Sequence, residues 1–362
     1  MNYRMSVLLP KELHSANATK VIDIDVIDPI SQIMVIYQPI NGAEAQATNH
    51  PAFCISKIEL VDGSDVLFSL SGVEAQAVDW YHRKQETPQL IYYLEGTECK
   101  QVYILNFGRH LWDPLYAFDP KKFTNPQLKI TIDVDGGGMS VTTGNLTVLA
   151  YLFDQRKIEP VGFLMHKEIK DYAMGAGTHE YTDLPTDFPY RKLFVRALKA
   201  GVGPDYCLGK IKLTEDFDRK IPFELTIDEI LMAIVGQTRP MRERIITHGH
   251  VTFRYYWCTP GYWPAFGAAG WTSSTTPQAA NVYEGDGGRF KLVSTTAGLN
   301  HQVLVEGFCP HNVIEIPFGL QDDPADWFDA AALGNLRLDI TSGATMSASE
   351  ACQVFLQQLR KY

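Results

Sequence analysis

The sequence predicts an all-β protein made of two tandem β-sandwich domains with short flanking helices. Three observations support this prediction: apolar and polar residues alternate in many short segments, helical patterns are scarce, and the order of the segments recurs in the second half of the chain. At 362 residues, the chain is long enough for two ordinary domains, each with its own core.

The alternating pattern is clearest in Leu128–Val134, where apolar side chains fall on one face and polar side chains on the other. This alternation is typical of a half-buried strand. Similar short segments are Val21–Ile27, Ile33–Tyr37, Ile55–Val61, Val102–Phe107, Leu146–Phe153, Leu193–Leu198, Val251–Trp257 and Val313–Pro317. Many short strands separated by Gly, Pro, Asn and Asp indicate sandwiches or barrels.

Two short helices are expected, each at a capping box. In Ser71–Glu74 and Thr226–Glu229, a hydroxyl and a carboxylate three residues apart can satisfy the free backbone N–H groups at a helix start. An apolar stripe follows each box, which indicates a helix with one buried face.

The two helix starts belong to a longer internal repeat. Ile55–Leu60 can be laid over Leu208–Leu213, Phe107–Gly108 over Phe318–Gly319, Leu128–Ile132 over Leu336–Ile340, and a final strand, Leu146–Phe153 or Cys352–Leu359, closes each half. Identities are few, so chance similarity is the alternative, but the preserved order favours a repeat. We therefore expect a first domain over residues 1–157 and a second over 158–362, with Glu159–Gly162 as the hinge.

The second copy is longer because it carries an insertion between its helix and Phe318. Around residues 259–288, Gly, Ala, Ser, Thr and Pro replace the alternating pattern. Loops of this length are uncommon in compact domains unless they have a role. The sequence thus predicts a long surface loop here.

Charge and cysteine usage limit the function. Lys and Arg total 32 against 42 Asp and Glu, a net charge of −10, and no basic run gathers into an arm. Direct binding of nucleic acid is not expected, because neutralising phosphates needs clustered Lys and Arg. The six cysteines are scattered singly and no signal peptide is evident, which favours reduced thiols in a protein that is made in a cytosol and not secreted.

Few residues suggest metal or nucleotide chemistry. His248 and His250 would share one face of a strand, as half of a metal site, but no third ligand is evident nearby. Asp133–Gly138 lacks the distal Glu of a calcium loop and the Lys-Ser/Thr of a phosphate-binding loop. We interpret it as a hairpin turn, and we expect no catalytic residue, cofactor or metal.

Two further segments have a functional and a structural interpretation. The aromatic stretch Tyr255–Trp271 could stack sugars, or it could pack beneath a long loop. Asp322–Trp327 is interpreted as a helix start with acidic residues near the positive end of the helix dipole.

Two runs combine turn and pairing residues in a characteristic order. The first is Ile104–Asp113 followed by Phe123–Ile130, and the second is Leu184–Arg196. Gly108 permits a bulge or a positive φ after an apolar strand. Arg109 and Asp113 can form a charge-assisted pair that ties the following loop, and Pro126 fixes the chain before the next strand.

In this order the runs resemble those of the double jelly-roll major capsid proteins of tailless icosahedral viruses. This lineage includes tectivirus coat proteins and the adenovirus hexon, and the resemblance is to its phage-type members. The resemblance spans roughly residues 20–362 and is weakest from Thr259 to Gly288. The residues that match the family's structural motifs are Phe107, Gly108, Arg109, Asp113, Asn125, Pro126, Leu128, Pro185, Pro189 and Arg191.

The resemblance implies two eight-stranded antiparallel jelly rolls in a subunit that forms a homotrimer, a pseudo-hexagonal capsomer, and then an icosahedral shell. It implies a virion protein whose partners are further copies of itself and other capsid proteins such as vertex or minor coat proteins. It leaves open a membrane beneath the shell. The alternative is a carbohydrate-binding or glycan-processing β-sandwich protein, which would bind a glycan as a small species.

Overall fold

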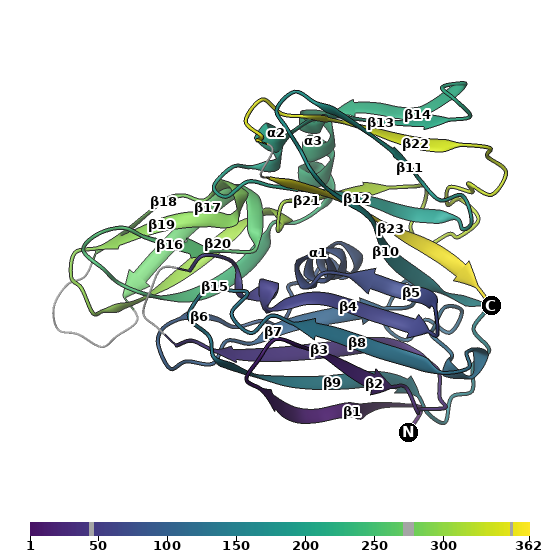
Figure 1. Ribbon diagram of the computed structural model, residues 1–362, viewed down its shortest axis with the longest axis horizontal. Coiled ribbons are helices and arrows are strands. Elements are labelled where there is room, and N and C mark those ends of the chain that lie inside the picture. The colour runs from purple at the N-terminus through teal and green to yellow at the C-terminus, as the bar shows by residue number, and fades with distance from the viewer. Residues whose placement is uncertain (43–46, 271–278, 348–349) are drawn as a thin grey trace.

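A computed structural model describes residues 1–42, 47–270, 279–347 and 350–362. Strands dominate these residues, and no helix among them is long and apolar enough to cross a membrane. The first half of the chain lies on one side of the molecule and the second half on the other, with helix α1 between them (Figure 1).

Eight strands of the first half form two antiparallel sheets. One sheet has the order β1 (Tyr3–His14), β9 (Thr143–Phe153), β3 (Ile30–Ile40), β7 (Gln101–Asn106), and the other has the order β2 (Ala18–Asp23), β8 (Pro126–Ile132), β4 (Ile55–Asp62), β5 (Asp65–Leu70). Two facing four-stranded sheets with this connectivity are a jelly roll. Leu128 and Ile130 of β8 are buried while Lys129 is not, so the predicted strand phase is confirmed.

The second half repeats this arrangement strand for strand. Its sheets have the orders β10 (Gly162–Ala173), β23 (Ala351–Lys361), β12 (Tyr190–Leu198), β21 (Val313–Pro317), and β11 (His179–Asp183), β22 (Leu336–Ser342), β13 (Leu208–Glu215), β14 (Lys220–Thr226). The same sequence of pairings in both halves confirms the internal repeat. The fold is therefore two tandem eight-stranded jelly rolls, as predicted.

The two rolls are joined through a shared sheet. β5 of the first roll pairs in parallel with β10 of the second, at Phe68 opposite His166, so that two four-stranded sheets merge into one of eight. β9 ends at Phe153 and β10 begins at Gly162. The boundary proposed after residue 157 lies in this connection.

Both predicted helices are present, and both begin with the predicted capping box. α1 (Gly72–Arg83) starts after Ser71, whose backbone N–H donates to Glu74 Oε2 at 2.7 Å. α3 (Ile227–Gln237) starts after Thr226, which contacts Glu229 in the same way at 2.8 Å. The shorter helical turns are η1 (Pro51–Cys54), η2 (Pro120–Lys122), α2 (Pro204–Cys207) and η3 (Asp286–Gly288).

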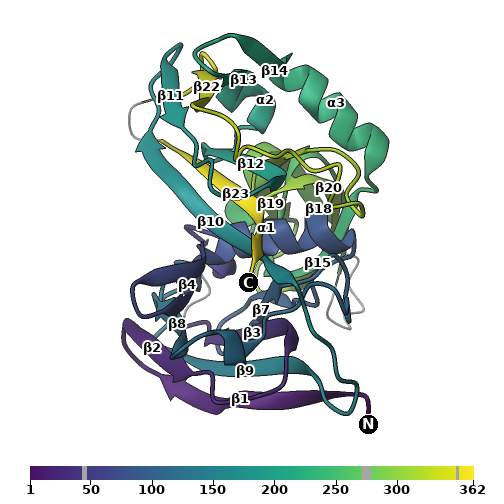
Figure 2. The same ribbon diagram turned by 90° about the vertical axis from the view of Figure 1, so that its right-hand side faces the viewer.

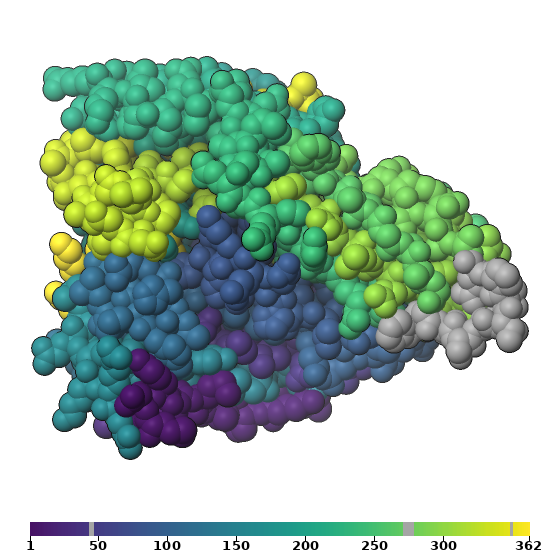
Figure 3. Space-filling view, turned by 180° about the vertical axis from the view of Figure 1, so that it is seen from behind, coloured from purple at the N-terminus to yellow at the C-terminus, as the bar shows by residue number. Residues whose placement is uncertain are grey.

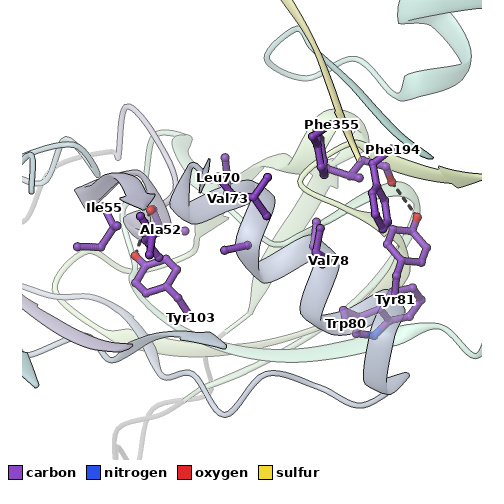
Figure 4. Packing of buried hydrophobic residues seen from close by; sticks show 14 of the residues in the cluster. Ala52, Ile55, Leu70, Val73, Val78, Trp80, Tyr81, Tyr103, Phe194 and Phe355 are labelled. Atoms are coloured by element: carbon purple, nitrogen blue, oxygen red, sulfur yellow. Dashed lines mark hydrogen bonds between the residues drawn. The ribbon is translucent and has the colours of Figure 1, made fainter. Parts of the chain in front are cut away.

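α1 lies in the continuous core between the rolls (Figures 2 and 4). Ten of its twelve residues are buried, because both rolls pack against it. Tyr81 near its C-terminal end donates to the carbonyl of Val313 in β21 at 2.8 Å, and its ring lies 6.1 Å from that of Phe194 in β12. The helix after β5 of the first roll thus holds the second roll in place.

The prediction of a long surface loop around residues 259–288 is wrong, because the described part of this region forms strands. An end module of six strands, β15 (Met241–His248), β16 (Arg254–Trp257), β17 (Pro260–Gly270), β18 (Ala280–Glu284), β19 (Arg289–Ser294) and β20 (Asn300–Pro310), separates α3 from β21. β6 (Ile91–Tyr93) of the first half pairs with β15. The alternation was hidden because β17 is an edge strand whose exposed half is built from Gly and Ala.

Two smaller predictions also need correction. Asp133–Gly138 is a turn, but not a hairpin, because β8 and β9 on either side of it belong to different sheets. Asp322–Trp327 does not start a helix: it forms successive turns in which Asp323 and Asp326 accept hydrogen bonds from the backbone N–H groups of Ala325 and Leu320. Aspartate side chains favour such turns by competing for nearby backbone donors.

Candidate functional site: an exposed sheet and a junction between the rolls

The segment after β7 is a rigid turn held by an ion pair. Asp113 is buried and accepts from Arg109 through two contacts, Nε to Oδ2 at 2.7 Å and Nη2 to Oδ1 at 3.1 Å. Burial alone would raise the pKa of Asp113, but the hydrogen bonds from Arg109 and from the backbone N–H of Leu115 outweigh it and lower this pKa below its ordinary value. The charge-assisted pair suggested by the sequence is present.

Phe107 and Gly108 position this turn. The Phe107 ring is fully buried and lies 5.3 Å from the ring of Phe118. A Cβ on Gly108 would lie 2.6 Å from Asp113 Cβ and 2.6 Å from the carbonyl oxygen of Tyr116. Gly108 is therefore required for close packing, and it does not have the positive φ that the sequence also allowed.

Asn125, Pro126 and Leu128 lie at the start of β8, where Pro126 is the first residue of the strand. The backbone N–H of Asn125 donates to Asp62 Oδ1 at 2.7 Å. Leu128 is fully buried between its partners Leu60 of β4 and Ile22 of β2. These residues fix the start of one strand, and in the described part of the chain they form no hydrogen bond with the Arg109 turn.

Pro185, Pro189 and Arg191 lead into β12. The carbonyl of Pro185 accepts from the hydroxyl of Tyr190, and the carbonyl of Pro189 accepts from the backbone N–H of Leu359 at 2.9 Å. Arg191 donates from Nε to the carbonyl of Gln321 at 3.1 Å. The segment thus anchors the entry of the second roll to the last strand and to the turns after β21.

The two motif arginines meet on one segment of the second roll. Arg109 Nη1 donates to the carbonyl of Asp322 at 2.8 Å, next to the Gln321 carbonyl that Arg191 contacts. Arg109 comes from the first roll and Arg191 from the second. The structure therefore brings the two motifs together at the junction between the rolls, a proximity that sequence spacing did not reveal.

The sheet β10–β23–β12–β21, which we call the covered sheet, is buried on both faces along its inner strand β12. Every residue of β12 from Tyr190 to Ala197 is buried. Lys192 donates from Nζ to the carbonyl of Tyr81 on α1 at 3.2 Å and forms a buried ion pair with Glu315. The face of β12 that would be exposed in an isolated roll is thus covered by the first roll.

The equivalent sheet of the first roll, β1–β9–β3–β7, which we call the outer sheet, faces away from the second roll (Figure 1). Val7 on β1 pairs with Leu149 on β9, which pairs with Met34 on β3, so these apolar side chains form a row on the outward face. Val7 is 57% exposed and Met5 61%. Adjacent exposed apolar side chains mark interaction surfaces.

The end module lies beyond one end of the rolls, and both labelled termini lie toward the other end (Figure 1). Tyr256 and Trp257 are buried, so these aromatic residues pack as in the structural interpretation, whereas Trp263 is exposed. Trp271 lies outside the described residues. The described aromatic residues of this stretch do not form a continuous platform.

The histidine pair does not have the predicted placement. His248 ends β15, and His250 lies in the segment after it, so the two do not share a strand face. His250 Nδ1 contacts Thr252 Oγ1 at 2.8 Å. Among the described residues, no group of three His, Cys, Asp or Glu side chains is placed to hold a metal ion.

No protein-family model and no curated protein sequence matches the chain, but solved structures do. The MCP of STIV, Sulfolobus turreted icosahedral virus, superimposes with a TM-score of 0.62 at 10% identity, covering 99% of this chain and 98% of that one. The major capsid protein P2 of bacteriophage PM2 gives 0.55 at 11% identity, covering 99% and 98%.

A third similar structure is VP54 of PBCV-1, fitted into a reconstruction of the virophage Sputnik, with a TM-score of 0.59 at 10% identity and coverage of 99% of this chain and 94% of that one. The superpositions include both rolls and the end module, since nearly the whole chain is covered in each case. The chain therefore has the double jelly-roll fold of these viral major capsid proteins.

Proposed function

We propose that this protein is a viral major capsid protein, a structural subunit that self-assembles and catalyses no reaction. The observation that carries the proposal is the strand-for-strand duplication of one jelly roll within a single chain. The end-to-end likeness to capsid proteins of an archaeal virus and a bacteriophage supports it.

The duplication suggests how assembly works. Two similar rolls side by side give one subunit two similar lateral surfaces. Three subunits around an axis then place six rolls in a ring, which tiles as a pseudo-hexagon, and closed symmetry of this kind repeats one interface in every copy. The homotrimer would be the capsomer, and an icosahedral shell its final assembly.

We assign the outward face of the outer sheet to contacts between subunits. It presents Met5 and Val7 to solvent in the isolated chain, although burying them would be favourable. The equivalent face of the second roll is already used inside the subunit. The end module would then project from the outer face of the shell, at the end of the rolls away from the termini.

The remaining partners follow from this role. The protein would be made in the host cytoplasm and reside in the virion, with vertex or minor coat proteins as neighbours and a membrane beneath the shell as a further candidate. The net charge of −10 makes direct contact with packaged nucleic acid unfavourable. A separate basic protein or a lipid layer would lie between shell and genome.

The carbohydrate-binding alternative has less support. Stacking of sugars needs exposed aromatic faces, but Tyr256 and Trp257 are buried. The ring of the nearby Tyr255 is covered by Arg289, whose guanidinium carbon lies 4.5 Å from the ring centroid.

Negative-stain microscopy of the purified protein tests the proposal. We expect pseudo-hexagonal, three-fold symmetric particles, alone or in sheets and shells. Discrete monomers at all concentrations and salt conditions, together with selective binding on a glycan array, would instead support the alternative.

A further inference from the structure

A cavity of about 550 Å³ lies at the junction of the two rolls. Its walls come from the C-terminal end of α1, from β12 and β21, and from α3. α1, α3 and the segment after β21 come together near the centre of the face shown in Figure 3. Small-molecule sites are typically concave, about 300–1,000 Å³ in volume, and mostly apolar with a few convergent polar groups.

Part of the cavity lining is apolar. Phe223 of β14, Ile230 and Ile234 of α3, and Ile316 of β21 line it. These side chains offer no hydrogen-bond partner, so a peptide or sugar lying against them would leave its own polar groups unsatisfied. An aliphatic chain meets no such cost.

Another part of the lining is cationic. His82, Lys84, Arg109, Arg191 and Lys192 line it, against the two acidic residues Glu315 and Asp322. Lys192 is paired with Glu315, and Arg109 with Asp113. Among the described residues, Arg191 and Lys84 have no carboxylate in ion-pair contact, so the cavity carries excess positive charge within an acidic protein.

Arg191 is the unusual member of this set, because it is only 3% exposed. Its contacts are neutral: the Gln321 carbonyl, Gln357 Oε1 and His82 Nδ1, each at 3.1 Å. Its Nη2 makes no hydrogen bond to any residue that the structure describes. A buried guanidinium without a carboxylate in direct contact is costly, and burial lowers the pKa of Arg191 to about 10, although the nearby charges of Glu315 and Asp322 oppose this shift.

His82 contacts Arg191 as a neutral acceptor. A guanidinium can only donate, so His82 Nδ1 must accept from Arg191, and the ring proton is then on Nε2. Burial, with the charges of Arg191 and Lys192, holds the pKa of His82 well below its ordinary value, which agrees with a neutral ring. Nε2 is shielded from solvent and has no hydrogen-bond partner among the described residues.

We propose that this cavity binds an amphipathic anion, an aliphatic carboxylate of the fatty-acid class. Its carboxylate lies beside Arg191, and its chain lies along Phe223, Ile230 and Ile234. The ligand supplies the direct ion-pair partner that Arg191 lacks among the described residues. Since His82 and α3 belong to different rolls, the ligand also bridges the rolls, and this role is independent of the proposed assembly function.

Binding of dodecanoate to the full chain, measured by isothermal titration calorimetry and thermal melting, tests the proposal. We expect dodecanoate to bind roughly tenfold or more tightly than dodecanol, which has the chain without the charge, because hydrogen bonds to charged groups carry this discrimination. Acetate, which has the charge without the chain, should not bind measurably. Bound dodecanoate should raise the melting temperature by about 2 °C or more.

Two variants on α3 locate the site without disturbing the core. Ala233 is exposed on the helix surface and lines the cavity, whereas its neighbour Met232 is exposed and does not. Ala233→Trp should fill the cavity and weaken dodecanoate binding at least about tenfold, while Met232→Trp should leave it unchanged. Equal affinity of the two variants, or equal affinity for dodecanoate and dodecanol, would overturn the proposal.

Discussion

The outer sheet and the covered sheet have the same strand order and opposite environments. In the outer sheet, β3 alternates between buried and half-buried residues over Met34–Ile40, as expected when one face packs on the roll's core and the other meets solvent. In the covered sheet, β12 is buried without a break, and its second face contacts α1. One duplicated element thus stabilises the subunit in one copy and remains available for assembly in the other.

The difference is visible in side-chain chemistry as well as in burial. The covered face of β12 carries Lys192 and Arg196. Lys192 forms an ion pair with Glu315, and Arg196 donates hydrogen bonds to the carbonyl of His311 and to Gln353. The outward face of the outer sheet instead presents uncharged side chains such as Val7, Leu149 and Met34. Buried charges specify one partner surface inside the chain, whereas an apolar face can accept a further copy.

Phe194→Asp should disrupt the covered sheet and cause the largest loss of stability. Phe194 is fully buried and stacks on Phe355 at 5.1 Å, so an aspartate there would be desolvated and unpaired. The cost of several kcal/mol is comparable with the whole stability of a domain, about 5–15 kcal/mol. Circular dichroism should show loss of the cooperative melt. A melt within a few degrees of the wild type would mean that the second roll does not depend on this contact.

The pH dependence of stability tests the packing between the rolls through Glu74, on the covered side of α1. Burial, with the nearby charge of Glu168, raises the pKa of Glu74 from 4.5 to about 7. Because the folded-state pKa is the higher one, stability is fully present below pH 4.5 and is lost as the pH rises from there through 7. The loss is on the order of 3 kcal/mol.

Urea unfolding at several pH values measures this loss. Glu74→Gln preserves the capping box, since Gln also suits this position, and should flatten the dependence between pH 4.5 and 7. An equally steep dependence in the variant would show that another group is responsible.

Asp113→Asn tests the contact that Arg109 makes between the rolls and should cause a smaller loss of stability. Losing the charge on Asp113 weakens its contacts with Arg109, which also holds the Asp322 carbonyl. We expect a loss of about 1–2 kcal/mol in the free energy of unfolding near neutral pH. The pKa of Asp113 is depressed, so its contribution is present above the unfolded value of 3.8 and is lost as the pH falls through the folded value. Wild type and variant should therefore converge in acid, and a constant difference down to pH 2 would contradict this assignment.

Val7→Asp should have the smallest effect on folding. Val7 is mostly exposed on an edge strand, and substitutions at such positions usually change stability by less than about 0.5 kcal/mol. Thermal melting should hardly change. A large drop would show that the outward face supports the fold of the isolated subunit.

The sequence predicts local features of this fold well and distant ones poorly. The phase of β8 and both capping boxes depend on residues within a few positions of one another, and the structure confirms them. In the end module, the predicted strand Val251–Trp257 overlaps β16, but β17 was missed because its Gly and Ala give no alternating signal.

The junction between the rolls could not be found from the sequence. Arg191 was identified through its motif, but its partners His82, Gln321 and Gln357 lie more than a hundred residues away along the chain. The covering of β12 by α1 likewise depends on how the two rolls pack. A continuous buried strand such as β12 is a signal of two covered faces, but it does not say which element covers them.

Sedimentation velocity of the wild type beside Val7→Asp tests the central claim most directly, that the outward face of the outer sheet is the surface through which copies associate. We expect a trimer or larger assembly for the wild type. For the variant we expect a folded monomer, or at least about tenfold weaker association, because each interface would bury an unpaired carboxylate. A wild type that remains monomeric at all concentrations, or a variant that assembles as the wild type does, would contradict it.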